Sequence, residues 1–134
     1  MKVLFFVLPL VLLFSCNNPS PLHKKLSATD SLEIVFNVPG TDTVVNQVNT
    51  TDAAAIKKIV KLVDGKTADG TPCGFNGHMS FFRENQLLLQ VVFAYEKEDC
   101  RQFLFDFQGR VQSTRVSNEA KDFLESLAAG RNWY

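Results

Sequence analysis

The sequence has no excess of charge of either sign, because its 134 residues include 14 lysines and arginines and 14 aspartates and glutamates. It also has no cluster of lysines and arginines, the feature expected of a nucleic-acid-binding surface. Its apolar runs fall short of the about 20 residues that a membrane-spanning helix needs. These absences argue against a nucleic-acid-binding protein and a polytopic membrane protein. The length fits one domain with one core.

Signatures of catalysis and nucleotide binding are missing as well. The sequence contains two histidines and has no phosphate-binding loop, no dinucleotide fingerprint and no G-x-S-x-G elbow. A nucleophile needs an adjacent base and a third group that orients this base. His78 is the one histidine in the expected folded region, so a small hydrolase centred on His78 is kept as an alternative. We expect no cofactor and no metal ion.

Residues 1–15 have the pattern of a secretory signal peptide, since Lys2 is followed by a short apolar stretch at residues 3–14. The motif Leu13-Phe14-Ser15-Cys16 resembles the lipobox of bacterial lipoproteins, in a form like that of Bacteroidota. The resemblance implies cleavage before Cys16, acyl chains such as palmitate on Cys16, and a place in the cell envelope. Asn17 stands where an aspartate favours inner-membrane retention, which implies the outer membrane facing the periplasm. The alternative is an ordinary signal peptide in which Cys16 is incidental.

Two tripeptides resemble the Asp-Ser/Thr-apolar pattern that Bacteroidota use for O-glycosylation of exported proteins. They are Asp30-Ser31-Leu32 and Asp42-Thr43-Val44. The resemblance makes Ser31 and Thr43 candidate acceptors. We expect Thr43 to be the weaker one, because residue 43 falls in a predicted strand.

Residues 16–31 are predicted to be a flexible tether between the lipid and a single domain at residues 32–134. The segment is polar and contains two prolines. It includes His23, Lys24 and Lys25, for which a solvated linker is favoured over a specific lipid site.

The pattern of the remaining chain predicts an α+β fold. Alternating apolar residues and turn signals predict strands at residues 32–38, 43–48, 78–83, 86–95, 100–107 and 110–116. Apolar residues at helical spacing predict helices at about 53–63 and 120–128, with Thr50 or Thr51 capping the first and Ser117 the second. Short hairpins require antiparallel pairing. We expect an antiparallel meandering sheet of about five to six strands with two helices packed on one face.

Two cysteines remain after Cys16 is assigned to lipid. An even pair in an exported protein predicts a disulfide between Cys73 and Cys100. Both cysteines fall at the same end of the predicted sheet, which favours this pairing. Free thiols and a zinc site of Cys73, Cys100 and His78 are the alternatives.

The predicted hairpin strands carry apolar side chains on both faces of the sheet. We expect the helices to cover the face formed by Phe82, Leu87, Leu89, Val91, Phe93, Phe103, Phe105 and Phe107. The opposite face is predicted to hold Met79, Phe81, Leu88, Val92 and Leu104. An uncovered apolar patch is typical of a partner or ligand site, so these five residues are the candidate binding face. The alternative is that the first hairpin, or Trp133 and Tyr134, covers it.

Together these features favour a small lipid-anchored envelope protein with a non-catalytic binding domain. Its expected partners are the membrane, through lipid on Cys16, and another envelope protein or an apolar ligand. Two alternatives remain, namely a small envelope hydrolase using His78 and a structural envelope component without a ligand.

Overall fold

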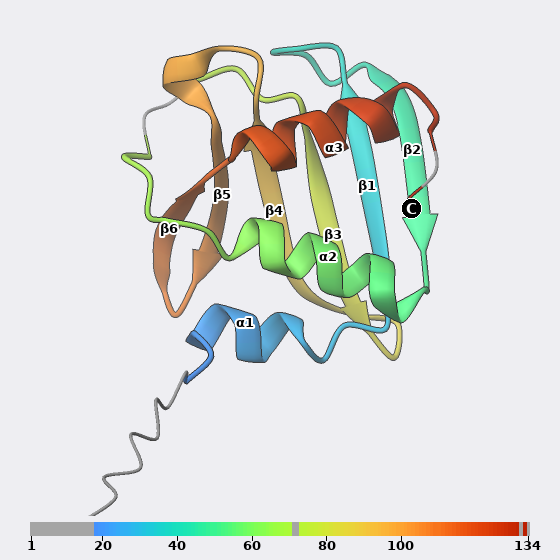
Figure 1. Cartoon of the computed structure of the whole chain (residues 1–134), viewed down its shortest axis with the longest axis vertical. Coiled ribbons are helices and arrows are strands. Elements are labelled where there is room, and N and C mark those ends of the chain that lie inside the picture. The colour runs from blue at the N-terminus through green and yellow to red at the C-terminus, as the bar shows by residue number, and fades with distance from the viewer. Residues whose placement is uncertain (1–17, 71–72, 132, 134) are drawn as a thin grey trace, which may run out of the picture.

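The structure, a computed structural model, describes residues 18–70, 73–131 and 133. The described chain contains six strands and three α-helices (Figure 1). The strands are β1 (Ser31–Asn37), β2 (Val44–Thr50), β3 (Gly77–Arg83), β4 (Gln86–Ala94), β5 (Gln102–Phe107) and β6 (Arg110–Arg115). The helices are α1 (Pro21–Leu26), α2 (Ala53–Val63) and α3 (Asn118–Ala128), and a 3-10 turn η1 spans Glu98–Cys100. Among the described residues, no helix combines the length and hydrophobicity needed to cross a bilayer.

The strands form one antiparallel sheet in the order β2-β1-β3-β4-β5-β6, which confirms the α+β class. Strands β3 to β6 follow one another as a meander, whereas β1 lies between β2 and β3 because the α2 segment carries the chain across it. The β3–β4 and β5–β6 hairpins turn on two residues each. Glu84 and Asn85 have positive φ angles, as do Gln108 and Gly109, and such angles match the twist of tight hairpins.

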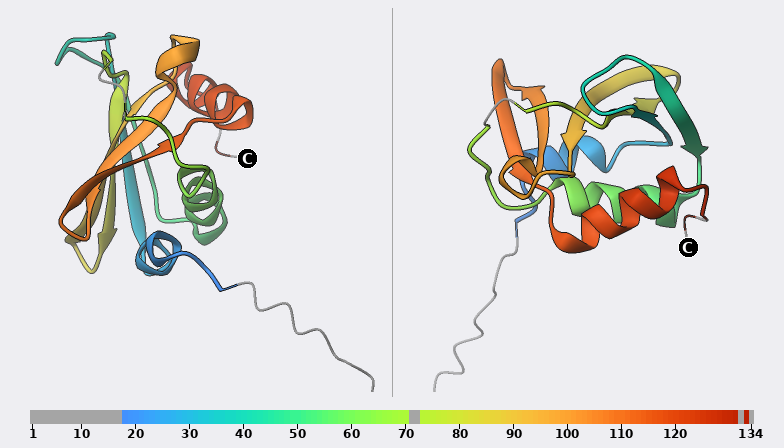
Figure 2. Two further views of the ribbon diagram at one scale, coloured as in Figure 1. Left: turned by 90° about the vertical axis from the view of Figure 1, so that its left-hand side faces the viewer. Right: turned by 90° about the horizontal axis from the view of Figure 1, so that it is seen from above.

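Helices α2 and α3 lie on the same side of the sheet (Figure 2). Their buried side chains join one core cluster with the inward-facing residues of the strands. Asp52 caps α2 by accepting a hydrogen bond from the Ala55 backbone N–H at 2.9 Å, so the prediction of Thr50 or Thr51 as the cap was wrong. Ser117 caps α3 through the Ala120 backbone N–H, as the sequence predicts.

Helix α1 corrects the prediction that residues 16–31 form a flexible tether. Its Leu22 and Leu26, one turn apart, are buried in the core cluster. Ser20 caps the helix by accepting from the His23 backbone N–H at 3.0 Å, and Pro21 occupies its first position, where a missing N–H is harmless. The described fold therefore extends at least eleven residues before Ser31, to Ser20.

Candidate functional site

The sheet has a second face, opposite the side that α2 and α3 cover, and we call it the open face (Figure 2). Of the helices that the structure describes, none lies on it. Strand register places one row of residues across all six strands on this face, because their chain neighbours point into the core. The open-face row, from β2 to β6, consists of Gln47, Val35, His78, Val92, Leu104 and Ser113.

The centre of the open-face row is aliphatic and its ends are polar. Val35 is buried by its neighbours, whereas His78, Val92 and Leu104 are half-buried. The adjacent row of the face is formed by polar residues, namely Asn49, Glu33, Ser80 and Gln90. The open face is thus a mixed surface with an apolar centre.

A groove of about 460 Å³ lies at the β5–β6 end of the open-face row. Leu104, Val111 and Ser113 line one side of the groove, and residues 67–70 form the wall on its other side. Val111 is 71% exposed. The volume is in the range of small-molecule sites, about 300–1,000 Å³.

Residues 66–70 are held against the free edge of β6 by main-chain hydrogen bonds. The Ala68 N–H donates to the Ser113 carbonyl at 3.0 Å, and the Arg115 N–H donates to the Lys66 carbonyl at 2.7 Å. The Ser113 hydroxyl donates to the Ala68 carbonyl at 2.8 Å. These bonds satisfy the edge of β6 and fix the wall of the groove.

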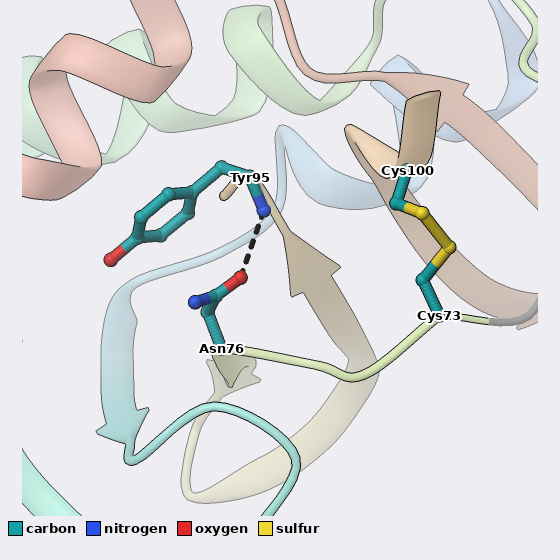
Figure 3. The surroundings of a disulfide bond; sticks show 4 residues. All are labelled: Cys73, Asn76, Tyr95 and Cys100. Atoms are coloured by element: carbon teal, nitrogen blue, oxygen red, sulfur yellow. Dashed lines mark hydrogen bonds between the residues drawn. A yellow bond between two sulfur atoms is a disulfide. The ribbon is translucent and has the colours of Figure 1, made fainter. Parts of the chain in front are cut away.

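The predicted disulfide between Cys73 and Cys100 is confirmed (Figure 3). It joins the segment that enters β3 to the turn that precedes β5, with the two Cα atoms 5.9 Å apart. This bond leaves neither thiol free for the alternative zinc site with His78. Within the described residues, no group of three or more histidine, cysteine, aspartate or glutamate side chains could hold a metal ion.

Asn76 fixes the same end of the sheet next to the disulfide. Its side-chain oxygen accepts a hydrogen bond from the Tyr95 backbone N–H at 2.9 Å (Figure 3). Burial raises the pKa of the Tyr95 phenol, and the negative charges of Glu125 and Glu96 raise it further. The phenol of Tyr95 is therefore uncharged at neutral pH.

Three residues of the predicted binding face lie elsewhere. Met79 and Phe81 are 0% exposed and belong to the core on the helix-covered side. Leu88 is half-buried and packs against the same core. Phe82 and Leu87, predicted for the core, pair with each other beyond an irregularity in the β3–β4 register.

The physical reason is a bulge. Phe81 pairs with Leu89, but Phe82 pairs with Leu87, so Leu88 has no residue opposite it. A bulge disrupts the simple alternation of side chains. The two-residue period of β3 places Met79 and Phe81, not Phe82, on the core face with Leu89.

Val92 and Leu104 do lie on the open face, next to each other in the row. Sequence reasoning missed Val35 and Ser113 as parts of the same surface, and it used His78 only as a catalytic alternative. The alternation of Leu32, Ile34 and Phe36 could have placed Val35 on this face. A hydrolase centred on His78 stays a prediction, and its direct neighbours in the row are the aliphatic Val35 and Val92.

The predicted modification sites differ in their surroundings. Cys16 lies outside the described residues, as does Tyr134. Thr43 is exposed and precedes the first residue of β2, whereas Ser31 is the half-buried first residue of β1. The Thr43 carbonyl nevertheless accepts from the Val38 N–H at 2.8 Å, so the backbone of both candidates takes part in pairing. Their glycosylation stays a prediction.

Trp133 was an alternative cover for the open face. Its ring instead lies 6.2 Å from the ring of Phe123 on α3, measured between centroids.

No family model, no curated protein and no solved structure matches this chain. The role of the open face therefore rests on its own geometry and chemistry.

Proposed function

We propose that this protein is a lipid-anchored component of the bacterial cell envelope whose domain binds a partner protein through the open face, without catalysis. The observation that carries the proposal is the position of Val92 and Leu104. They are half-buried aliphatic neighbours on a sheet face that no described helix covers. An apolar centre surrounded by polar residues is the usual anatomy of a protein interface.

The charge of the open face supports a protein partner. Its open-face row contains no carboxylate, and the adjacent row contains Glu33 and, where it continues onto β5, Asp106 opposite Val111. Interfaces are depleted in charged residues at their centre. The wall formed by residues 67–70 is fixed by hydrogen bonds to Ser113. Binding would therefore require little loss of conformational entropy in this segment.

The anchor is supported by the lipobox resemblance at Cys16. A protein with two or more acyl chains stays stably on a membrane, whereas one chain gives marginal binding. The anchor would hold the open face within reach of other envelope proteins.

Site-specific photocrosslinking in intact cells tests the proposal. A photoreactive amino acid at Val111, which is 71% exposed on the open face, is expected to give one discrete adduct. The substitution Leu104→Asp is expected to abolish this adduct while the domain stays folded, because it places a charge in the centre of the interface. The photoreactive residue at Asp122 on α3, an exposed position on the covered side, is expected to give no such adduct.

Val44→Asp is the matched control, since it adds the same charge at an exposed position of β2 outside the central rows. It is expected to leave the adduct unchanged. The proposal is wrong if Leu104→Asp keeps the adduct, or if adducts form equally from Val111 and Asp122.

A further inference from the structure

A basic groove lies on the other side of the sheet from the open face, between the end of α2 and the start of α3. It has a volume of about 410 Å³. Its lining residues include Lys58, Lys61, Lys66 and Arg115, together with Leu62 and Glu119. The Arg115 side chain points to the open face, because Thr114 before it and Val116 after it are buried on the core side. Three lysines against one carboxylate give this groove a net positive charge, although the whole chain has none.

Among the described residues, these three lysines take part in no ion pair. Within the part of the chain that the structure describes, the ion pairs are Arg83–Glu84 and Lys121–Glu125. The Lys58 ammonium lies over the Phe123 ring, 4.0 Å from its centroid, and this contact leaves its charge in place. The groove therefore offers unpaired positive charge to an anionic surface.

The described chain begins beside this groove. The Ser20 hydroxyl donates to the carboxylate of Asp64, with its oxygen 2.9 Å from each carboxylate oxygen. Asp64 directly precedes Gly65, which lines the groove. Cys16 stands four residues before Ser20, so an extended chain between them spans at most about 14 Å.

A lipid on Cys16 would keep the start of the domain within about two Debye lengths of the membrane surface, since the Debye length at physiological salt is about 8 Å. Helix α1 adds the exposed Lys24 and Lys25 beside the same point. The exposed acidic residues Glu96, Glu98 and Asp99 lie in the β4–β5 connection, at the end of the sheet away from α1 (Figure 1). The lysines of the groove and of α1 thus lie near the start of the described chain, together with the carboxylate of Asp64.

We infer that the basic groove, with Lys24, docks on the anionic phospholipid surface that holds the anchor. The inference rests on the proposed lipid anchor at Cys16. Each lysine or arginine near an anionic membrane surface favours the docked state about fivefold. Docking through the α2–α3 side would leave the open face, on the other side of the sheet, free for its partner.

Lysine acylation on vesicles tests this orientation. The natural protein, purified from membranes, is inserted into vesicles of phosphatidylcholine alone or of phosphatidylcholine with phosphatidylglycerol. A water-soluble acylating ester and mass spectrometry then measure the rate at each lysine. Lys61 and Lys66 are expected to react several-fold more slowly on the anionic vesicles. Lys97 in the β4–β5 connection is expected to react equally on both, and about 1 M salt, with a Debye length of about 3 Å, should remove the difference.

A charge-neutralising variant and a matched control complete the test. Lys61→Gln with Lys66→Gln is expected to abolish the protection of Lys58 on anionic vesicles. Lys97→Gln with Arg131→Gln removes the same charge from exposed positions outside the groove and is expected to leave Lys58 protected.

The outcomes separate the orientation from the anchor. Flotation of the protein with vesicles in a density gradient measures membrane binding. If the protein floats with both vesicle types but its groove lysines are acylated at equal rates on the two, the inferred orientation alone is overturned. Flotation with anionic vesicles alone supports docking and overturns the lipid anchor. Flotation with neither vesicle type overturns both.

Discussion

The Ser20 hydroxyl joins helices α1 and α2 by a hydrogen bond to Asp64, which lies 44 residues further along the chain. Its oxygen lies 2.9 Å from each carboxylate oxygen of Asp64, the residue that ends α2, and it also accepts from the His23 N–H at 3.0 Å. One side chain thus caps α1 and ties it to α2. The consequence is that the domain stands four residues from Cys16.

Removing this hydroxyl should loosen α1. We expect Ser20→Ala to lower the free energy of unfolding by about 1–2 kcal/mol, because it loses a helix cap and a charge-assisted hydrogen bond. Amide hydrogen exchange in α1 should accelerate, and urea unfolding measures the loss. Ser27→Ala, whose hydroxyl bond to the His23 carbonyl is exposed, is the control and should cost less. Equal costs for the two variants would contradict this role of Ser20.

The adjacent residues Phe81 and Phe82 should respond very differently to truncation. Phe81 is fully buried in the core, whereas Phe82 is half-buried on the open face. We expect Phe81→Ala to lower the free energy of unfolding by about 3–5 kcal/mol. Phe82→Ala should cost about 1 kcal/mol, since it removes less buried apolar surface. Chemical denaturation decides between this assignment and the reverse, in which Phe82 is the costlier residue.

Reduction of the disulfide should destabilise the domain. Cys73 and Cys100 are 27 residues apart, and closing a loop of this size contributes about 3–4 kcal/mol in the chain-entropy model. The intact mass should be lower than that of the dithiol by two hydrogen atoms. Unfolding with and without reductant measures the stability difference. Rapid alkylation of both cysteines in the native, unreduced protein would rule the bond out.

Gly77 should not accept a side chain. A Cβ atom there would overlap the Val35 carbonyl oxygen and would lie 2.8 Å from the Phe93 ring. We expect Gly77→Ala to cost about 3 kcal/mol or to prevent folding, because neither neighbour can move freely. Gly74→Ala is the control, since its nearest contact would be an ordinary 3.5 Å. A Gly77→Ala variant as stable as the Gly74→Ala variant would show that β1 and β3 are not paired in this register.

The strands were predictable because alternation and two-residue turns are local signals. The strands β3 to β6 start and end within two residues of their predicted bounds. The face of β3 was not predictable in the same way, since Phe81 and Phe82 are adjacent aromatic residues and either can point to the core. Packing against Leu32 and Leu89 decides it, and those contacts are distant in sequence.

Helix α1 was missed because six residues give almost no helical period. Its signals were the Ser20-Pro21 start and the spacing of Leu22 and Leu26, and they sit in a segment that is otherwise polar. The wall at residues 67–70 was missed because its order comes from hydrogen bonds to Ser113. The Cys73–Cys100 bond, by contrast, followed from cysteine number and the predicted ends of the strands.

Lipid on Cys16 is the central claim, because both the proposed function and the inferred orientation depend on it. Metabolic labelling with palmitate tests it most directly, with the natural chain compared with Cys16→Ser. We expect label in the natural protein and none in Cys16→Ser. Cys73→Ser with Cys100→Ser should keep the label. Label that persists in Cys16→Ser, or its absence from the natural protein, would contradict the account.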